Sequence, residues 1–214
     1  MTLPLAGTYR AGLMAPLDKE RVDAVPGIQT ALTTAQAGVT SSIQQGLHTI
    51  WLPATGMIGR TTSGPVYNAT ETSTNKVMVA GYDYDPNTAQ YGQFAIAMPK
   101  SWDRGTVSAQ FVWTAASGSG AVVWGIQGLA VGDGDALDAA FGMAVTVTDA
   151  LLSANQAHLT SATSAMTIAG SPAALDTVIL QVYRDAAAGG DTLSASARLI
   201  GVRLYLTINA QTDA

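Results

Sequence analysis

RGTVSAQFVWTAA, at residues 104–116, alternates apolar and polar side chains with a period of two. This period is typical of a β-strand that buries one face and exposes the other. The expected inward side chains are Val107, Ala109, Phe111 and Trp113, and the expected outward ones are Ser108, Gln110, Val112 and Thr114. The segment therefore predicts a half-buried strand with Trp113 in the core.

Four further runs show the same alternation. They are QYGQFAIAMP (90–99), GAVVWGIQGLAV (120–131), TVILQVYRD (177–185) and RLIGVRLYLTIN (198–209). Their expected inward residues are Phe94, Ile96, Met98, Val122, Trp124, Ile126, Val178, Leu180, Val182, Ile200, Val202, Leu204, Leu206 and Ile208. Turn sequences such as YDPN, SGSG and AGGD separate the runs. The pattern predicts a mainly β chain whose head, residues 50–214, is an antiparallel, jelly-roll-like β-sandwich.

Residues 1–49 differ in character and are predicted to form an anchoring arm and a short helical stalk. Pro4, Gly7, Gly12 and Pro16 disfavour a helix, so we expect an extended arm over residues 1–21. The side chains expected to dock this arm on a partner are Leu3, Leu5, Tyr9, Leu13, Met14 and Leu17. An arm of this kind cannot bury these side chains by itself.

A helical spacing follows over residues 27–47, where the apolar positions are Ile28, Leu32, Val39, Ile43 and Leu47, with Ala35 between them. The helix is intrinsically weak, so it either associates with other copies, with a trimer preferred, or packs on its own domain. Residues 51–75 are expected to be an irregular crossing into the head, and residues 135–142 a turn of helix.

Charged residues make up 12% of the 214-residue chain, about half the roughly 25% of ordinary globular domains. Two interpretations remain open: much of the surface lies against other copies or another protein, or the chain is a monomer with a neutral Ser/Thr surface. The net charge of −5 and the scattered basic residues argue against a nucleic-acid partner.

No apolar stretch approaches the roughly 20 residues needed to span a bilayer, so membrane insertion is not expected. The N-terminus has no basic leader followed by an apolar block, so no signal peptide is expected. The chain contains no cysteine, which excludes disulfides, thiolate zinc sites and thiol nucleophiles.

The sequence offers little for catalysis. Its two histidines, His48 and His158, are far apart in the chain and are interpreted as surface or hydrogen-bonded residues. Nucleophile-elbow, phosphate-loop and dinucleotide-binding patterns are absent. We therefore predict no catalytic residue and no cofactor.

Acidic residues gather in two turns, GYDYDPN with Asp83 and Asp85, and GDGDALD with Asp133, Asp135 and Asp138. Carboxylates at alternate positions can converge on calcium, but the rest of a calcium loop is missing. The simpler interpretation is that the carboxylates accept hydrogen bonds from nearby backbone amides, and no metal site is predicted.

Aromatic residues suggest a binding surface. Trp113 and Trp124 share the phase of aliphatic neighbours and are expected in the core. The candidate glycan-binding residues lie in or beside turns and are Tyr82, Tyr84, Asp85, Tyr91 and Trp102. Aromatic rings near carboxylates can stack on sugars while the acids accept hydroxyl protons. The alternative is that these rings cap the edge of the sandwich with their polar atoms reaching water.

Several runs resemble the head domains of fibre, spike or decoration proteins of tailed bacteriophages and gene-transfer-agent-like particles. The resemblance covers about residues 50–208 and is most specific in YDYDP, in MPKSWDRGTV, and in the pairing of VYRD with DTLSASARLIGV. It implies a jelly-roll-like sandwich, often trimeric, that projects from a particle. It also implies an N-terminal arm that docks on a capsid, portal or tail protein, and it carries over no catalytic residue.

These observations favour a non-enzymatic structural virion protein, attached through its N-terminus, whose head contacts a host surface polysaccharide or dresses the particle. Such a protein would be assembled in the bacterial cytoplasm and released by lysis. One alternative is a carbohydrate-binding module that acts on its own. A less favoured alternative is a polysaccharide-degrading enzyme using Asp83, Asp85, Asp133 or Asp135.

Overall fold

A computed structural model describes residues 16–44, 46–210 and 213, with side chains described from residue 24 to 39 and from residue 46 onward. The chain divides into two compact units, residues 1–44 and 45–214. The boundary predicted at residues 49 and 50 falls inside the first strand of the second unit. None of the described helical residues forms a segment long and apolar enough to cross a membrane.

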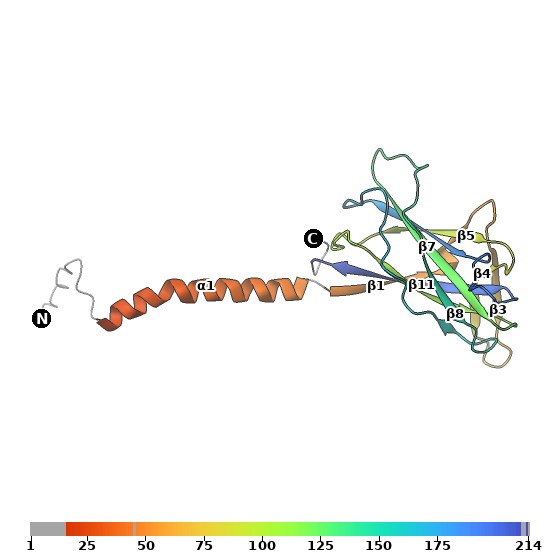
Figure 1. Ribbon diagram of the computed structural model, residues 1–214, viewed down its shortest axis with the longest axis horizontal. Helices are drawn as coiled ribbons and strands as arrows, with labels where there is room; N and C mark the ends of the chain where they lie inside the picture. The colour runs from red at the N-terminus through yellow and green to blue at the C-terminus, as the bar shows by residue number, and fades with distance from the viewer. Residues whose placement is uncertain (1–15, 45, 211–212, 214) are drawn as a thin grey trace, which may run out of the picture. The chain divides into compact units, whose positions relative to one another are not determined.

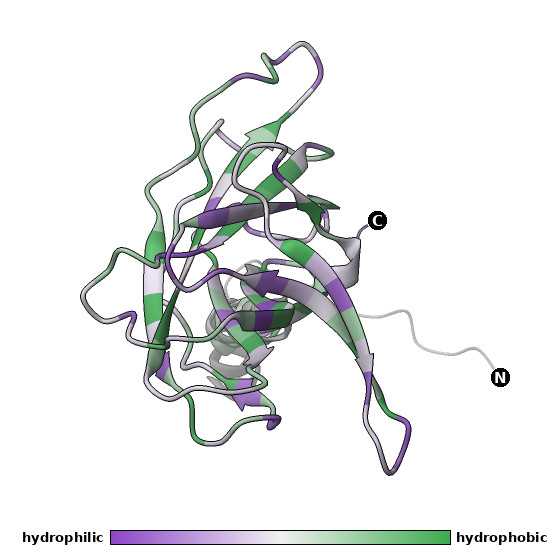
Figure 2. Cartoon of the chain, turned by 90° about the vertical axis from the view of Figure 1, so that its right-hand side faces the viewer, coloured by the Kyte–Doolittle hydropathy of each residue, from purple (hydrophilic) through white to green (hydrophobic). Residues whose placement is uncertain are grey.

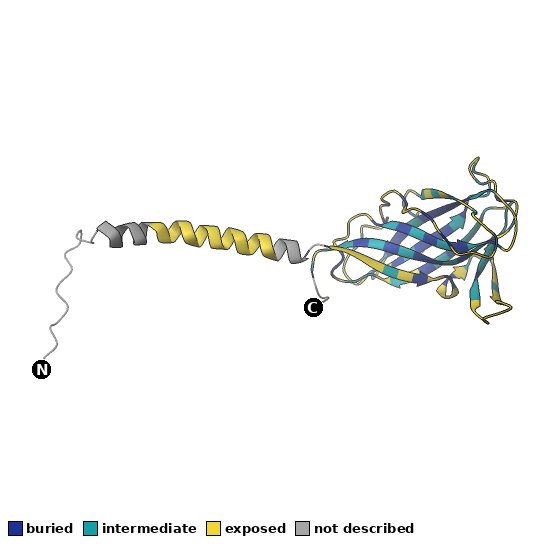
Figure 3. Ribbon diagram, turned by 90° about the horizontal axis from the view of Figure 1, so that it is seen from below, coloured by how far each residue is buried: buried dark blue, intermediate teal, exposed yellow. Residues whose placement is uncertain are grey.

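The first unit contains one helix, α1 (Pro16–Gln44). Its start corrects the prediction of an extended arm up to residue 21, because proline is well tolerated in the first turn of a helix, where its missing N–H has no partner to lose. Its end corrects the predicted helix over 27–47, since Leu47 lies in a strand. The described side chains of α1, residues 24–39, are all exposed (Figure 3).

The second unit is a β-sandwich, as the alternating runs predict (Figure 1). Its strands are β1 (Gly46–Pro53), β2 (Ile58–Gly59), β3 (Val66–Glu71), β4 (Met78–Tyr84), β5 (Gln90–Ala97), β6 (Ser108–Thr114), β7 (Ala121–Val131), β8 (Val145–Ala150), β9 (His158–Leu159), β10 (Thr177–Arg184) and β11 (Ala197–Ile208). A short 3₁₀ helix, η1 (Ala54–Gly56), follows β1.

The strands form two antiparallel sheets. Sheet A has the order β3-β4-β11-β6-β9, and β1 also pairs with β11; sheet B has the order β2-β5-β10-β7-β8. β4 pairs with residues 197–199 of β11 and β1 with residues 201–208, while β6 pairs with both stretches. β1 and β4 therefore share one edge of β11, and this long strand organises the whole of sheet A.

The core lies between the inner faces of the two sheets, and apolar and polar residues alternate along the strands (Figure 2). The predicted inward residues of β6 and β7 are confirmed, because Phe111, Trp113, Trp124 and Ile126 have no exposed surface. The Trp124 ring stacks on Phe111 with ring centroids 5.6 Å apart. Aromatic packing of this kind adds about 0.5–1.5 kcal/mol beyond the burial of the rings.

The phase predicted for the start of β11 is wrong. Ile200 is an extra residue in β11, since the pairing with β6 shifts between Leu199 and Gly201. Such a bulge reverses which side chains face the core. Leu199 and Ala197 are therefore buried on one side of the bulge, and Val202 and Leu204 on the other.

Two further expectations are corrected. Residues 51–75 are not an irregular crossing, because β1 pairs with β11 along all eight of its residues and β3 pairs with β4. Residues 135–142 form no helix. Asp135 instead closes a turn, since its Oδ2 accepts a hydrogen bond of 2.9 Å from the Gly132 amide, and this confirms the interpretation of that acidic run as a turn.

Candidate functional site

One row of side chains crosses the outer face of sheet A. Asp83 of β4 and Thr114 of β6 both pair with Arg198 of β11, on its two edges. The next residues along these strands, Tyr84 and Trp113, point the other way and are fully buried. Because side chains alternate across a sheet, Asp83, Arg198 and Thr114 lie side by side on the outer surface.

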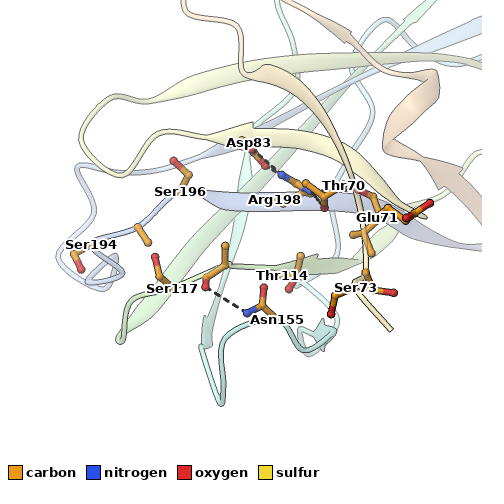
Figure 4. A pocket seen from close by; sticks show the side chains of 14 residues that line it. Thr70, Glu71, Ser73, Asp83, Thr114, Ser117, Asn155, Ser194, Ser196 and Arg198 are labelled. Atoms are coloured by element: carbon orange, nitrogen blue, oxygen red, sulfur yellow. Dashed lines mark hydrogen bonds and ion pairs between the residues drawn. The ribbon is translucent and has the colours of Figure 1, made fainter. Parts of the chain in front are cut away.

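A groove of about 840 Å³ lies over this row. Its walls come from β3, β4, the end of β6 with the turn after it, residue 155 and the segment before β11. Its lining is rich in hydroxyl and amide groups, which belong to Thr70, Thr72, Ser73, Thr114, Ser117, Asn155, Ser194 and Ser196. Figure 4 shows Arg198, Asp83 and Thr70 along one side, with Thr114, Ser117 and Asn155 across from them.

Each charged side chain that lines the groove has an ion-pair partner. Arg198 donates from Nε and Nη2 to the two carboxylate oxygens of Asp83, at 2.6 and 3.0 Å. Its Nη1 donates to Thr70 Oγ1 at 2.8 Å and to the Val79 carbonyl at 3.2 Å. Glu71 at the rim lies 3.2 Å from the Lys76 ammonium. A two-pronged arginine–carboxylate pair of this kind is rigid and leaves little net charge for a ligand.

Thr114 stands out among the lining residues. Its Oγ1 is buried and has no hydrogen-bond partner among the described residues. A buried hydroxyl without a partner costs about 1–3 kcal/mol, so such groups are usually satisfied by water or by a ligand. The Thr114 hydroxyl is therefore a group in the groove lining that gains from an added partner.

A buried ion pair holds the segment that supplies Ser194 and Ser196. The side chains of Arg184 and Asp191 are 0% and 1% exposed and are joined at 2.6 Å. Arg184 also donates to the backbone carbonyls of Leu193 and Ala195. The end of β10 therefore fixes residues 191–195, shortly before β11, and Ser194 and Ala195 of this segment line the groove.

Two of the predicted glycan-binding residues prove to be core residues. Tyr84 is 0% exposed and Trp102 is 3% exposed. The Tyr84 ring meets Trp124 edge-on, with centroids 5.0 Å apart, and burial raises the pKa of its hydroxyl, with a further contribution from Tyr82. The structure corrects the prediction for Tyr84 and Trp102, because a ring enclosed in the core offers no face to a sugar.

The other three predicted residues reach the surface to different degrees, and their glycan-binding role stays a prediction. Tyr82 is half-buried and its hydroxyl donates to the Met57 carbonyl at 2.9 Å. Asp85 stabilises a turn, since its Oδ1 accepts from the amides of Asn87 and Thr88.

Tyr91 is half-buried on the outer face of sheet B. Its ring lies 5.4 Å from that of Tyr183, with which it pairs directly, and the Arg60 guanidinium sits 4.7 Å from its centre. Tyr91 therefore lies on the opposite sheet from the groove and does not line it. The structure does not gather the five predicted residues into one site.

The remaining candidates are placed as follows. His158 is buried, stacks on Trp113 and lies 3.1 Å from the Ser153 carbonyl oxygen, which confirms its interpretation as a hydrogen-bonded residue. His48 is exposed on β1. Among the described side chains, no three His, Asp or Glu residues come together as a metal-binding group. The predicted anchoring side chains of Leu3, Leu5, Tyr9, Leu13, Met14 and Leu17 lie outside the described ones.

The sequence prediction missed the groove because its lining residues come from five separate segments. Serine and threonine residues that belong to no motif do not indicate a binding site in a single sequence. One available signal was the alternation in YDYD, which places Asp83 opposite in phase to Tyr82 and Tyr84. Another was Arg198 at the start of the otherwise apolar strand β11, since a charged residue that packs in a sheet requires a partner.

Comparison with known proteins gives only distant similarities. No protein-family model matches the chain, and no curated protein sequence matches it. Solved structures with a similar fold include the C-terminal CBM6 of LamC, a marine laminarinase from Zobellia galactanivorans (9% identity, TM-score 0.33, covering 73% of this chain and 98% of that one). A family 11 carbohydrate-binding module from Clostridium thermocellum, in complex with a β-1,3-1,4-mixed-linked tetrasaccharide, has 8% identity and a TM-score of 0.33, covering 79% of this chain and 91% of that one.

A structure of infectious bursal disease virus, Gx strain, has 13% identity and a TM-score of 0.32, covering 77% of this chain and 32% of that one. At these TM-scores and identities, the similarities support no conclusion about what this chain binds or assembles with.

Proposed function

We propose that the protein is a non-enzymatic structural component of a bacteriophage-type virion, whose β head binds a neutral glycan in the groove on sheet A. The virion assignment is supported by the resemblance of residues 50–208 to the head domains of phage fibre, spike or decoration proteins. The glycan assignment is carried by one observation, the buried and unpartnered Thr114 hydroxyl in a groove lined by hydroxyl and amide groups.

The chemistry of the lining favours a neutral, many-hydroxyl ligand. Hydroxyl and amide groups both donate and accept, so they match sugar hydroxyls of either orientation. Arg198 and Asp83 neutralise each other, and four of the hydrogen bonds that Arg198 donates already go to protein groups. An anionic ligand would find no free cation here among the described lining residues, whereas a neutral one loses nothing.

Replacing Thr114 with Val tests the site. Valine keeps the shape and the strand preference of threonine but removes the hydroxyl. We expect the affinity for a bound oligosaccharide to fall about 5- to 10-fold, which corresponds to one hydrogen bond of about 1–1.4 kcal/mol. We expect stability without ligand to be unchanged or slightly higher, because an unpartnered buried hydroxyl is removed. The measurements are binding to a panel of neutral bacterial-surface oligosaccharides and urea denaturation.

Tyr91→Ala is the matched control, because it alters an aromatic residue on the outer face of sheet B and leaves the groove intact. Unchanged binding in Thr114→Val together with lost binding in Tyr91→Ala would move the site to sheet B. No binding of the unaltered protein to any oligosaccharide on the panel would remove the glycan proposal.

Attachment through the N-terminus is tested by deleting residues 1–15, which leaves α1 complete because the helix begins at Pro16. We expect the shortened protein to fold but to be absent from purified particles, because the deleted residues carry most of the apolar side chains predicted to dock on a capsid, portal or tail protein. Immunodetection on particles separated by density provides the measurement.

The Thr114→Val variant is the control for this deletion and should be incorporated normally. Normal incorporation of the shortened protein would contradict the anchor. Absence of the unaltered protein from particles would instead favour a carbohydrate-binding module that acts on its own, since the groove does not depend on the arm.

A further inference from the structure

The described part of α1 carries an apolar stripe with nothing packed on it. Its members are Val25, Ile28, Leu32, Ala35 and Val39, and the exposed fractions of the four larger side chains lie between 53% and 66%. Every other described side chain of the helix is exposed as well. The stripe begins before residue 27, because the helix extends N-terminally of the segment that periodicity alone predicts.

The spacing of the stripe is that of a coiled coil. The intervals between its members are three, four, three and four residues, which is the alternation of positions a and d in a heptad repeat. Val25, Leu32 and Val39 then occupy a positions, and Ile28 and Ala35 occupy d positions. A helix that packs on a globular domain has a wider apolar face and is not restricted to this narrow seam.

The residues beside the seam fit self-association. From residue 24 to residue 44 the chain contains no charged residue, so copies meet without like-charge repulsion and no charged partner is selected. Ala31 and Gly38 flank one side of the seam and are small, while Gln29 and Gln36 flank the other and can reach across. Three threonines on the outward face, Thr30, Thr33 and Thr34, donate their hydroxyls to helix carbonyls at 2.8–2.9 Å.

The helix requires such a partner for its stability. Pro26 lies inside it and cannot donate a backbone hydrogen bond, and the segment is rich in Thr, Ser and Gly, which are weak helix formers. An isolated helix of this composition is marginal in water. Burial of the seam between copies supplies the apolar contact that the single chain lacks.

We infer that α1 forms a parallel coiled coil with two further copies of this chain, through the seam Val25–Ile28–Leu32–Ala35–Val39. Leucine at an a position next to isoleucine at a d position, as in Leu32 and Ile28, favours three or four strands over two. Parallel alignment places each seam residue in a layer with its own counterparts. This inference stands independently of the glycan-binding proposal, because no seam residue lines the groove.

The test compares the solution mass of three full-length proteins by light scattering at micromolar concentration. We expect the unaltered protein to have three times the chain mass of 21.9 kDa. Leu32→Asp places a charge in the seam and should reduce the mass threefold. Thr34→Asp places the same charge on the outward face of the same helix and should leave the trimer intact.

Each other outcome overturns the inference. A monomeric unaltered protein excludes the coiled coil, and a dimer excludes the trimeric seam. A trimer that persists in Leu32→Asp places the assembly surface on the head. Dissociation of both Leu32→Asp and Thr34→Asp would show that an added charge disrupts the helix as a whole, and not this seam in particular. The urea midpoint of the head should be the same in all three proteins, which separates loss of assembly from unfolding of the sandwich.

Discussion

Replacing Asp191 with Ala will lower the free energy of unfolding by about 3–5 kcal/mol, because it leaves the Arg184 charge buried and unpaired. Arg184 has no exposed side-chain surface, and Asp191 accepts hydrogen bonds from its Nε at 2.9 Å and from its Nη2 at 2.6 Å. Asp191 also accepts a hydrogen bond from the Val123 amide at 3.0 Å. Urea denaturation followed by circular dichroism measures the loss.

The exposed pair Lys76–Glu71 supplies the control for Asp191→Ala. Its side chains are well exposed to solvent and lie 3.2 Å apart, so Glu71→Ala should cost less than about 1 kcal/mol. The double change Arg184→Met with Asp191→Leu should recover much of the loss, because it removes both charges. Equal effects of Asp191→Ala and Glu71→Ala would show that the buried pair contributes nothing special to stability.

Asp191→Ala should also weaken ligand binding in the groove. Arg184 holds the carbonyls of Leu193 and Ala195, and the same segment presents Ser194 and Ser196. Loss of the ion pair therefore loosens one wall of the groove even under conditions where the head remains folded.

Replacing Trp124 with Ala will cost about 3–5 kcal/mol, the usual range for deleting a large aromatic side chain from a core. Trp124 is fully buried and contacts three rings, those of Tyr84, Phe111 and Trp113. A cavity at this position would separate the two sheets where their aromatic residues meet. The measurement is again urea denaturation by circular dichroism, which does not depend on tryptophan fluorescence.

Trp51→Ala is the matched control, since Trp51 is 46% exposed on β1. We expect it to cost clearly less than Trp124→Ala, because nearly half of the Trp51 side chain is already in contact with water. A similar loss in both variants would contradict the assignment of Trp124 to the centre of the core.

Local alternation in the sequence was sufficient to predict which side chains of β6, β7 and β10 face inward. In each case the strand is regular, so a period of two along the chain maps directly onto the two faces of the sheet. β11 shows the limit of this argument. A single extra residue, Ile200, reverses the faces on one side of the bulge, and nothing in RLIGVRLYLTIN marks Ile200 rather than its neighbours as the extra residue.

The aromatic residues next to turns show a different limit of prediction from sequence. Tyr84 precedes the turn residue Asp85, and it was predicted to be accessible for that reason. The strand β4 in fact continues to Tyr84, so the alternation in YDYD places both tyrosines inward and Asp83 outward. The periodic signal was present, and proximity to a turn was the weaker guide.

Period and phase along the chain are enough to predict that it is mainly β, that Trp113 and Trp124 are core residues, and that a helical stripe precedes the head. These features depend on residues that lie close together in the sequence, so the spacing of the apolar residues reveals them. Which strands become neighbours depends on the folded chain, and this pairing brings Asp83, Thr114 and Arg198 into one row. The groove exists because antiparallel pairing places residues more than a hundred positions apart side by side, and the energy of that pairing lies in burial of the opposite face.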